Sequence, residues 1–346
     1  MPVAALSILD QSTTAMGRGA DEAIRETLAL ARLADELGYR RYWLAEHHNS
    51  AAHAGAAPEM LVAAIAATTH RIRIGTAGVM LPHYSPLKVA EQFRVAEAIA
   101  PGRIDLGLGR APGSDGRTAY ALNPNAREAA EQFPAAVRDL MGWLGDGLPD
   151  QHPFRAVTAS PAVPTRPEVW ILGSSDYGAQ VAAYFGLPYA FAHFITEGEG
   201  AAAALATYRE GFRAHPDVPG RLAAPHAALG VFALAADTEA AARRLFASRA
   251  LFRLRRDQGV FAPLPSVEEA EAYPYSEFER AQVERLAARA IIGAPEQVRA
   301  RLEALAAELG AAELAVLSPC HDPAARRRSV TLLAQAFGLQ AVSQSG

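Results

Sequence analysis

Apolar segments of strand length alternate along this chain with segments of helical periodicity, and the alternation occurs eight times. The strands that this pattern predicts are residues 5–10, 41–46, 72–81, 104–109, 168–173, 188–194, 228–235 and 313–318. The predicted helices are 21–37, 58–69, 86–100, 127–144 and 176–185, one after Thr196 and Glu199 at capping-box spacing, one from 237 and one after 322.

Strands that alternate with helices pair in parallel, and eight such units close into a barrel. We therefore expect one domain over residues 1–346 with the (β/α)₈ TIM-barrel fold. The competing architecture is an open doubly wound sheet, which needs a glycine-rich turn after its first strand. Here the first strand is followed by Gln11-Ser12-Thr13-Thr14, which argues against that alternative.

Two stretches do not fit the minimal repeat. Residues 149–167 are rich in proline and predict a surface excursion before the fifth strand. Residues 253–290 form an insertion between the seventh and eighth strands, with charged residues and three prolines. Long insertions at the loop face of a barrel are often lids, and a solvated excursion is the equal alternative.

Composition narrows the class of partner. The 346 residues carry a formal net charge of −4 and contain no long run of lysine or arginine, so we do not expect nucleic acid as a partner. The single cysteine, Cys320, cannot form an internal disulfide, so a reducing compartment is expected. Residues 1–5 lack the basic start of a secretory signal, and the apolar stretch 60–67 is too short to cross a membrane. We expect a cytoplasmic protein with no membrane association.

Glycines gather within or at the end of three successive predicted strands: Gly75, Gly78, Gly107, Gly109 and Gly173. Glycine weakens a strand interior, so it often marks close approach by a ligand or by another backbone. Tight packing explains any single one of these glycines. Five of them together favour a flat ligand lying against the barrel wall.

Polar side chains follow the fourth and fifth predicted strands. Arg110 comes directly after the fourth strand, where a permanent positive charge suits a phosphate or carboxylate. Ser174 and Ser175 precede a helix whose free N–H groups could bind the same anion. The alternatives are a surface ion pair for Arg110 and simple helix capping by Ser175.

The second strand ends in a cluster of ionisable residues. Glu46, His47 and His48, together with His53, could suggest a metal site, but their spacing matches no metal motif and we expect no metal. A histidine with a pKa near neutrality, donating or accepting a proton beside a reacting centre, is the better interpretation, and a hydrogen-bonded structural histidine is the alternative.

These pieces resemble the bacterial-luciferase-like flavin monooxygenases. The resemblance rests on residues 42–48, 75–82, 101–110, 169–175 and 293–298, in that order and at that spacing. It is strongest to a bacterial subgroup related to alkanal monooxygenase, which shares the sequence of residues 110–115.

The resemblance implies that reduced FMN binds at the carboxyl ends of the strands. Arg110, Ser174 and Ser175 then match the phosphate positions, and Ala77–Gly78 matches a cis peptide beneath the ring. His47 matches a catalytic base, and His193 falls near the edge of the flavin. Three positions depart from luciferase: Gly109 replaces a cysteine, Ser174 a carboxylate and Gly178 a threonine.

By the same resemblance, the expected activity is that of a flavin-dependent monooxygenase that uses O₂ on a small organic substrate. A separate flavin reductase would supply the reduced FMN, and a homodimer would form through the second and third helices. The alternatives are a deazaflavin-dependent hydride-transfer enzyme and a non-catalytic flavin-binding protein.

Overall fold

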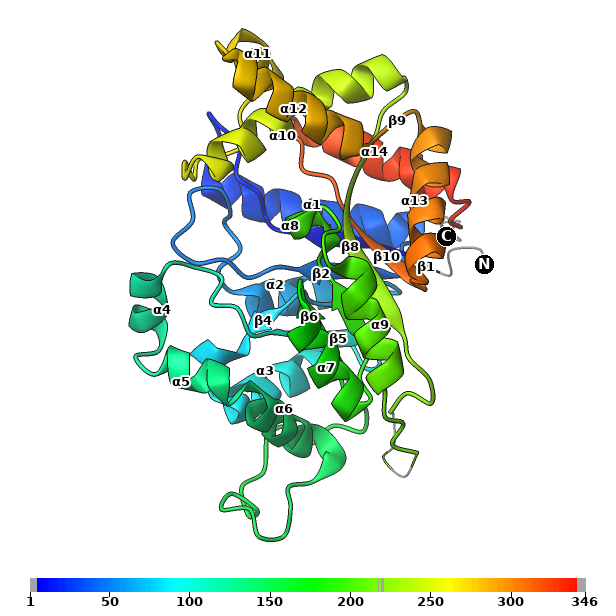
Figure 1. Cartoon of the computed structure of the whole chain (residues 1–346). Helices are drawn as coiled ribbons and strands as arrows, with labels where there is room; N and C mark the ends of the chain where they lie inside the picture. Colours follow the sequence, from blue (N-terminus) through cyan, green and yellow to red (C-terminus); the bar gives the residue numbers. More distant parts are fainter. Residues whose placement is uncertain (1–4, 217, 219–220, 341–346) are drawn as a thin grey trace.

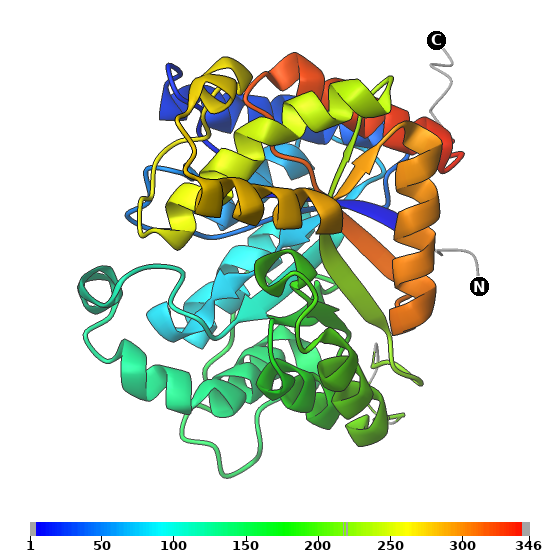
Figure 2. The same cartoon turned by 45° about the horizontal axis from the view of Figure 1, so that its top comes forward.

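The computed structural model describes residues 5–216, 218 and 221–340. Its centre is a closed ring of eight parallel strands, in which the last strand pairs with both the first and the seventh of the ring. In ring order the strands are β1 (Ala5–Asp10), β2 (Arg41–Leu44), β3 (Arg73–Thr76), β5 (Ile104–Gly109), β6 (Glu168–Gly173), β7 (Tyr189–Phe191), β8 (Ala227–Ala235) and β10 (Glu313–Leu317). The predicted TIM-barrel fold is therefore confirmed, and helices surround the ring (Figures 1 and 2).

Two short strands lie outside this ring. β4 (Val79–Met80) pairs with β5, and β9 (Ile291–Gly293) pairs with the end of β8. The sequence predicted one strand over 72–81, and this was wrong: β3 ends at Thr76, and the backbone pairs with β5 again only from Val79. The peptide between Ala77 and Gly78 at this break is cis, as the resemblance implied.

The helices on the first half of the chain follow the predicted pattern closely up to β5. They are α1 (Ala20–Leu37), α2 (Pro58–Ala66), α3 (Pro86–Ile99), α4 (Gly116–Leu122), α5 (Ala126–Glu131) and α6 (Phe133–Met141), with short helical turns at Leu81–His83 and Gly142–Asp146. The single helix predicted over 127–144 is thus divided, and α4 was not predicted. Asp115 begins α4 by accepting hydrogen bonds from the N–H groups of Arg117 and Thr118.

The helices of the second half are α7 (Asp176–Phe185), α8 (His193–Thr196), α9 (Ala201–Gly211), α10 (Glu239–Asp257), α11 (Val267–Ala272), α12 (Glu277–Arg289), α13 (Pro295–Leu309) and α14 (Pro323–Ala336). The predicted capping box at Thr196 was wrong. Thr196 ends the short helix α8, and Gly200, with a positive φ, precedes α9.

The 253–290 insertion begins later than predicted, because α10 continues through Arg253 to Asp257. The remainder of the insertion contains α11 and α12, which contact α10 (Figure 1). Residues 149–167 carry neither helix nor strand, as expected of an excursion between Asp146 and β6.

The barrel holds two apolar layers. Inside the ring, Trp43 and Trp170 meet edge to face with ring centroids 4.9 Å apart, in one apolar cluster with alanines of β7, β8 and β10. Between the ring and the helices lies a larger cluster that takes apolar residues from every barrel strand. This packing fixes the strand ends from which the site is built.

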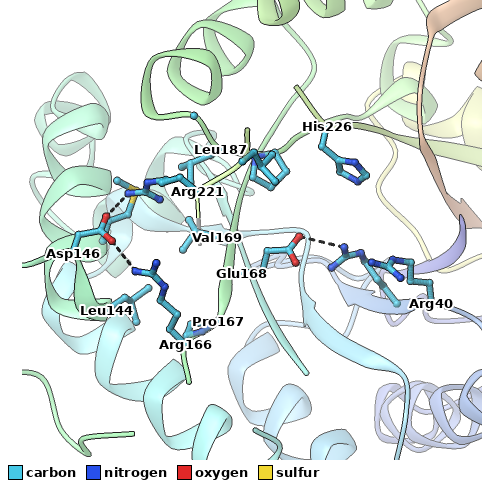
Figure 3. A pocket seen from close by; sticks show the side chains of 15 residues that line it. Arg40, Leu144, Asp146, Arg166, Pro167, Glu168, Val169, Leu187, Arg221 and His226 are labelled. Atoms are coloured by element: carbon cyan, nitrogen blue, oxygen red, sulfur yellow. Dashed lines mark hydrogen bonds and ion pairs between the residues drawn. The ribbon is translucent and has the colours of Figure 1, made fainter. Parts of the chain in front are cut away.

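Paired charges close the barrel at the amino ends of its strands. Arg41, almost fully buried, donates to Asp105 (2.8 Å), Glu313 (2.9 Å) and Glu168 (3.2 Å). One pocket on this face has a volume of about 260 Å³, and two more of its arginines are paired in the same way, since Asp146 binds both Arg166 and Arg221 (Figure 3). Charges on this face compensate one another, which favours a structural role.

Candidate active site

A cavity of about 910 Å³ opens at the carboxyl ends of the barrel strands. This is the face on which TIM barrels carry their sites, and the volume suits a cofactor with a small substrate. Seven of the eight residues predicted from the sequence line it: His47, Ala77, Gly78, Gly109, Arg110, Ser174 and Ser175.

One end of the cavity gathers groups that can bind an anion. The guanidinium carbon of Arg110 lies 3.9 Å from the centre of the Tyr177 ring, in the first turn of α7. Ser175 is the N-cap residue of α7, yet its hydroxyl makes no capping hydrogen bond, so simple capping does not account for it. The Tyr189 hydroxyl donates to the Ser175 carbonyl (2.9 Å) and fixes this turn. The helix start, its two serines and Arg110 thus face one pocket.

The glycines of the barrel strands differ in how much space a side chain would have. A Cβ on Gly75 would lie 2.2 Å from the Asp105 carbonyl oxygen, and one on Gly107 would lie 2.1 Å from that of Thr76, so packing of neighbouring strands requires both. At Gly173 and Gly230, both in the cavity wall, a Cβ would come no closer than 3.5 and 3.4 Å to any atom. Side chains there would occupy the cavity, so glycine keeps its wall flat.

His47 stacks on His53, with ring centroids 4.4 Å apart, and both rings line the cavity. Each Nδ1 is buried, and neither has a hydrogen-bond partner in the part of the chain that the structure describes. Burial, together with the nearby His48, lowers the pKa of His47 to about 4. The expectation of a pKa near neutrality was therefore wrong, because burial destabilises the imidazolium and the adjacent carboxylate, Glu46, is engaged by His48. His47 is a neutral hydrogen-bonding group at pH 7.

A second histidine of the cavity belongs to a hydrogen-bonded network. Glu46, which is almost fully buried, accepts from the Tyr84 hydroxyl (2.6 Å) and from the backbone N–H of Met80 (2.9 Å), and lies 2.7 Å from His48 Nε2. The sequence placed these residues beside the site but could not separate the two histidines. The structure does: His48 is held by Glu46, and His47 is free to meet a ligand.

His193 is the one predicted residue that the structure does not bring to this cavity. It lines an adjoining cavity of about 520 Å³ with Glu197 and Arg253. Its neighbours Phe194 and Ile195 border the main cavity instead, because β7 ends at Phe191 and the short α8 turns the chain. Its predicted contact with a flavin edge stays a prediction.

Sequence reasoning missed the wall that α10 and the following segment contribute. This wall consists of Arg249, Phe252, Arg256, Val260 and Phe261. The only signal was the insertion itself, which starts near these residues. The segment after α10 forms part of the cavity wall, and its role as a lid stays a prediction.

The described residues contain neither a metal-binding cluster nor a helix suited to cross a membrane. No group of three or more histidine, cysteine, aspartate or glutamate side chains there is arranged to hold a metal ion. Nor does any helix of that part of the chain have the length and apolar character that a membrane crossing requires.

The structure is thus a closed TIM barrel with a cavity of a cofactor's size at its carboxyl face. The luciferase-like monooxygenase family model matches residues 5–313, and the chain belongs to this family. It is 40% identical over 331 residues to the luciferase-like monooxygenase of Escherichia coli, covering 95% of each chain. It is 37% identical over 331 residues to the N-acetyl-S-alkylcysteine monooxygenase of Bacillus subtilis, covering 96% of this chain and 97% of the relative.

Solved structures agree. Apo-MsnO8 matches with a TM-score of 0.86 at 39% identity, over 98% of this chain and 99% of that one. Two more distant structures share the fold. The oxygenating constituent of 3,6-diketocamphane monooxygenase from Pseudomonas putida, in complex with FMN, matches with a TM-score of 0.71 at 19% identity over all of both chains. An F420-dependent secondary alcohol dehydrogenase with an F420–acetone adduct matches with a TM-score of 0.63 at 14% identity, over 97% of this chain and 99% of that one.

Proposed function

We propose that this chain is an FMN-dependent monooxygenase that acts on a small organic substrate. When bound, reduced FMN supplies the two electrons for the reaction, in which one atom of O₂ enters the substrate and the other leaves as water. The observation that carries the proposal is the placement of Arg110, Ser174 and Ser175 in the same cavity as His47, whose Nδ1 has no partner among the residues that the structure describes.

The residues present fit a phosphorylated flat cofactor. Arg110 and the N-terminus of α7 would hold the phosphate, because a guanidinium and free backbone N–H groups both stabilise an anion. The flat wall at Gly173 and Gly230 leaves room for a ring system. The cavity also has the apolar lining such a site needs to exclude water, from Trp43, Phe194, Phe252 and others.

His47 would act through its neutral imidazole. A pKa of about 4 leaves it unprotonated at pH 7, so it can accept a hydrogen bond or a proton from a ligand in the cavity. The stacked His53 holds the ring in place, since the two centroids are 4.4 Å apart.

A separate flavin reductase would deliver the reduced FMN. This part of the proposal rests on the sequence, which carries no glycine-rich dinucleotide turn after its first strand. The relative from Bacillus subtilis directs the choice of first substrates toward N-acetyl-S-alkylcysteines.

The direct test uses the purified chain, FMN, a flavin reductase with NADH, and ¹⁸O₂. N-acetyl-S-alkylcysteines and apolar carbonyl compounds are supplied as substrates, and products are read by mass spectrometry. The proposal requires one ¹⁸O atom in a product, and requires that His47→Ala reduce this product at least tenfold at saturating FMN. NADH oxidation with no ¹⁸O-labelled product from any substrate would count against a monooxygenase.

Two alternatives to a monooxygenase can be tested by comparing the affinities of the chain for FMN and for F420. Tighter binding of F420 than of FMN would point to a deazaflavin-dependent hydride-transfer enzyme. FMN binding without turnover, unchanged in His47→Ala, would point to a non-catalytic flavin-binding protein.

We also propose that the chain forms a homodimer through α2 and α3. These helices contact each other and expose three large apolar side chains, Met60 on α2 and Val95 and Ile99 on α3. Burying such side chains against a second copy would remove them from water.

A further inference from the structure

Arg249 is a buried cation without a counter-ion. Three arginines in the described ranges are buried, namely Arg41, Arg249 and Arg253. Arg41 has three carboxylate partners, and Arg253 pairs with Glu197 at 3.2 Å. Arg249, only 8% exposed, makes no ion pair or hydrogen bond with any residue that the structure describes. An unpaired buried charge is costly, so its presence calls for a ligand.

The guanidinium of Arg249 is held ready for an anion. Its carbon lies 4.4 Å from the centre of the Phe232 ring, and this stacking leaves the N–H edge of the group unused. Arg249 lines both the main cavity and the adjoining one, and Arg256, two turns further along the same face of α10, lines the main cavity with it. The nearby acid, Glu197, is already engaged by Arg253 and by Arg289.

The position of Arg249 places such an anion beside the histidine pair. The charge of Arg249 is among the causes that lower the pKa of His53, and His53 stacks on His47. Phe252, one helical turn from Arg249 on α10, packs with Ala52 next to His53. An anion bound here would therefore lie against the part of the cavity where His47 meets a ligand.

We propose that Arg249, assisted by Arg256, binds the carboxylate of the substrate. The substrate class is then a carboxylic acid, with the group to be oxygenated held near His47. This inference rests on the proposed function, because it assigns the second ligand of the same cavity. It also gives α10 and the segment after it the role of selecting the substrate.

The flavin phosphate is the other anion that could reach an arginine here. The phosphate end already has Arg110 and the start of α7, which follow β5 and β6. Arg249 follows β8 and lies beside the loop after β2, next to a different part of the wall. Burial and the neighbouring Arg253 and Arg256 lower the pKa of Arg249 to about 9, so it stays charged at pH 7 and a bound carboxylate relieves that repulsion.

The test compares carboxylic acids with their matched carboxamides, which keep the shape and lose the charge. Calorimetric titrations use acetate, octanoate and N-acetyl-S-methylcysteine, each against its amide, with and without saturating FMN. The variant is Arg249→Met. The control is Arg244→Met, the same change on the same helix at a half-exposed arginine paired with Glu268 and Glu271.

We expect wild type and Arg244→Met to bind at least one acid tenfold or more tightly than its amide. Arg249→Met should lose this preference and keep the affinity for FMN. Absence of any acid preference in the wild type, or a preference that persists in Arg249→Met, overturns the inference. Loss of discrimination between FMN and riboflavin in Arg249→Met also overturns it, since the arginine would then serve the phosphate. Failure of the wild type to bind FMN at all would instead remove the proposed function.

Discussion

The guanidinium of Arg110 lies over the ring of Tyr177, 3.9 Å from its centre, and this contact joins the end of β5 to the first turn of α7. Two segments more than sixty residues apart thereby present one positive edge to the cavity. The tyrosine ring orients the guanidinium and leaves its positive charge uncompensated. A carboxylate at the same position would neutralise that charge.

Removing the Tyr177 ring, on which Arg110 stacks, should weaken FMN binding moderately. A cation–π contact contributes about 0.5–1 kcal/mol at a partly exposed site, so Tyr177→Leu should raise the FMN dissociation constant about two- to fivefold. Tyr184→Leu is the control, because Tyr184 stacks on Arg213 from the same helix but away from the cavity. Equal effects of the two variants in a fluorescence titration would show that Tyr177 has no particular role in the site.

The histidine pair should make the fold sensitive to acid. Burial, with neighbouring positive charge, lowers the pKa of His47 to about 4 and that of His53 to about 3 in the folded state, whereas an unfolded histidine titrates near 6.5. The unfolded chain therefore binds protons first as the pH falls. Stability that is present above about pH 6.5 is lost progressively as the pH falls toward 4.

The measurement is the change in Tm between pH 7.5 and pH 5.0. We expect this change to be smaller in the double variant His47→Gln, His53→Gln than in the wild type. His70→Gln alters an exposed histidine and should leave it as in the wild type. An unaltered pH dependence in the double variant would mean that the two imidazoles are not the groups that resist protonation.

Arg41 should matter for stability and not for the site. Arg41→Leu removes the buried cation that Asp105 and Glu313 share, and breaking such a buried ion pair costs about 3–5 kcal/mol in the free energy of unfolding. Arg40→Leu, at the adjacent half-exposed position, should change it by about 0.5 kcal/mol or less. Urea unfolding measures both, and a cost for Arg41→Leu no larger than that for Arg40→Leu would contradict the structural role of the cluster.

The proposed dimer predicts a change of mass in solution. Met60→Glu places a charge in the proposed interface on α2 and should raise the dimer dissociation constant at least tenfold. Phe278→Glu makes the same kind of change on α12, where a side chain is equally exposed, and should have no effect. Sedimentation velocity measures the oligomeric state of each variant. A wild type that is monomeric at tens of micromolar would rule out the proposed interface.

Much of the fold could be predicted because its signals are local. The bounds of β1, β5, β6 and α7 were predicted to the residue, since each apolar run ends at a polar residue or glycine. The strand 72–81 was predicted as continuous because nothing local marks the departure of Ala77 and Gly78 from the ring. The helix α4 was missed because it has no buried residue and hence no apolar stripe.

The site was predictable where residues follow strand ends, as Arg110 and Ser175 do, because the topology alone brings such positions together. The protonation state of His47 was not, because it depends on burial and on the neighbouring His48. Arg249 could not be found either. It lies within a helix with many arginines, and only the packing of α10 over the loop after β2 reveals which of them is buried.

The most direct measurement is the affinity of the wild type and of Arg110→Met for FMN and for riboflavin, which lacks the phosphate. A charge-assisted hydrogen bond contributes about 1.5–3 kcal/mol, so the wild type should bind FMN about 10- to 100-fold more tightly than riboflavin. In Arg110→Met most of this difference should disappear while riboflavin affinity is kept. Equal affinity of the wild type for both flavins, or a difference that survives the loss of Arg110, would contradict a phosphate site at this end of the cavity.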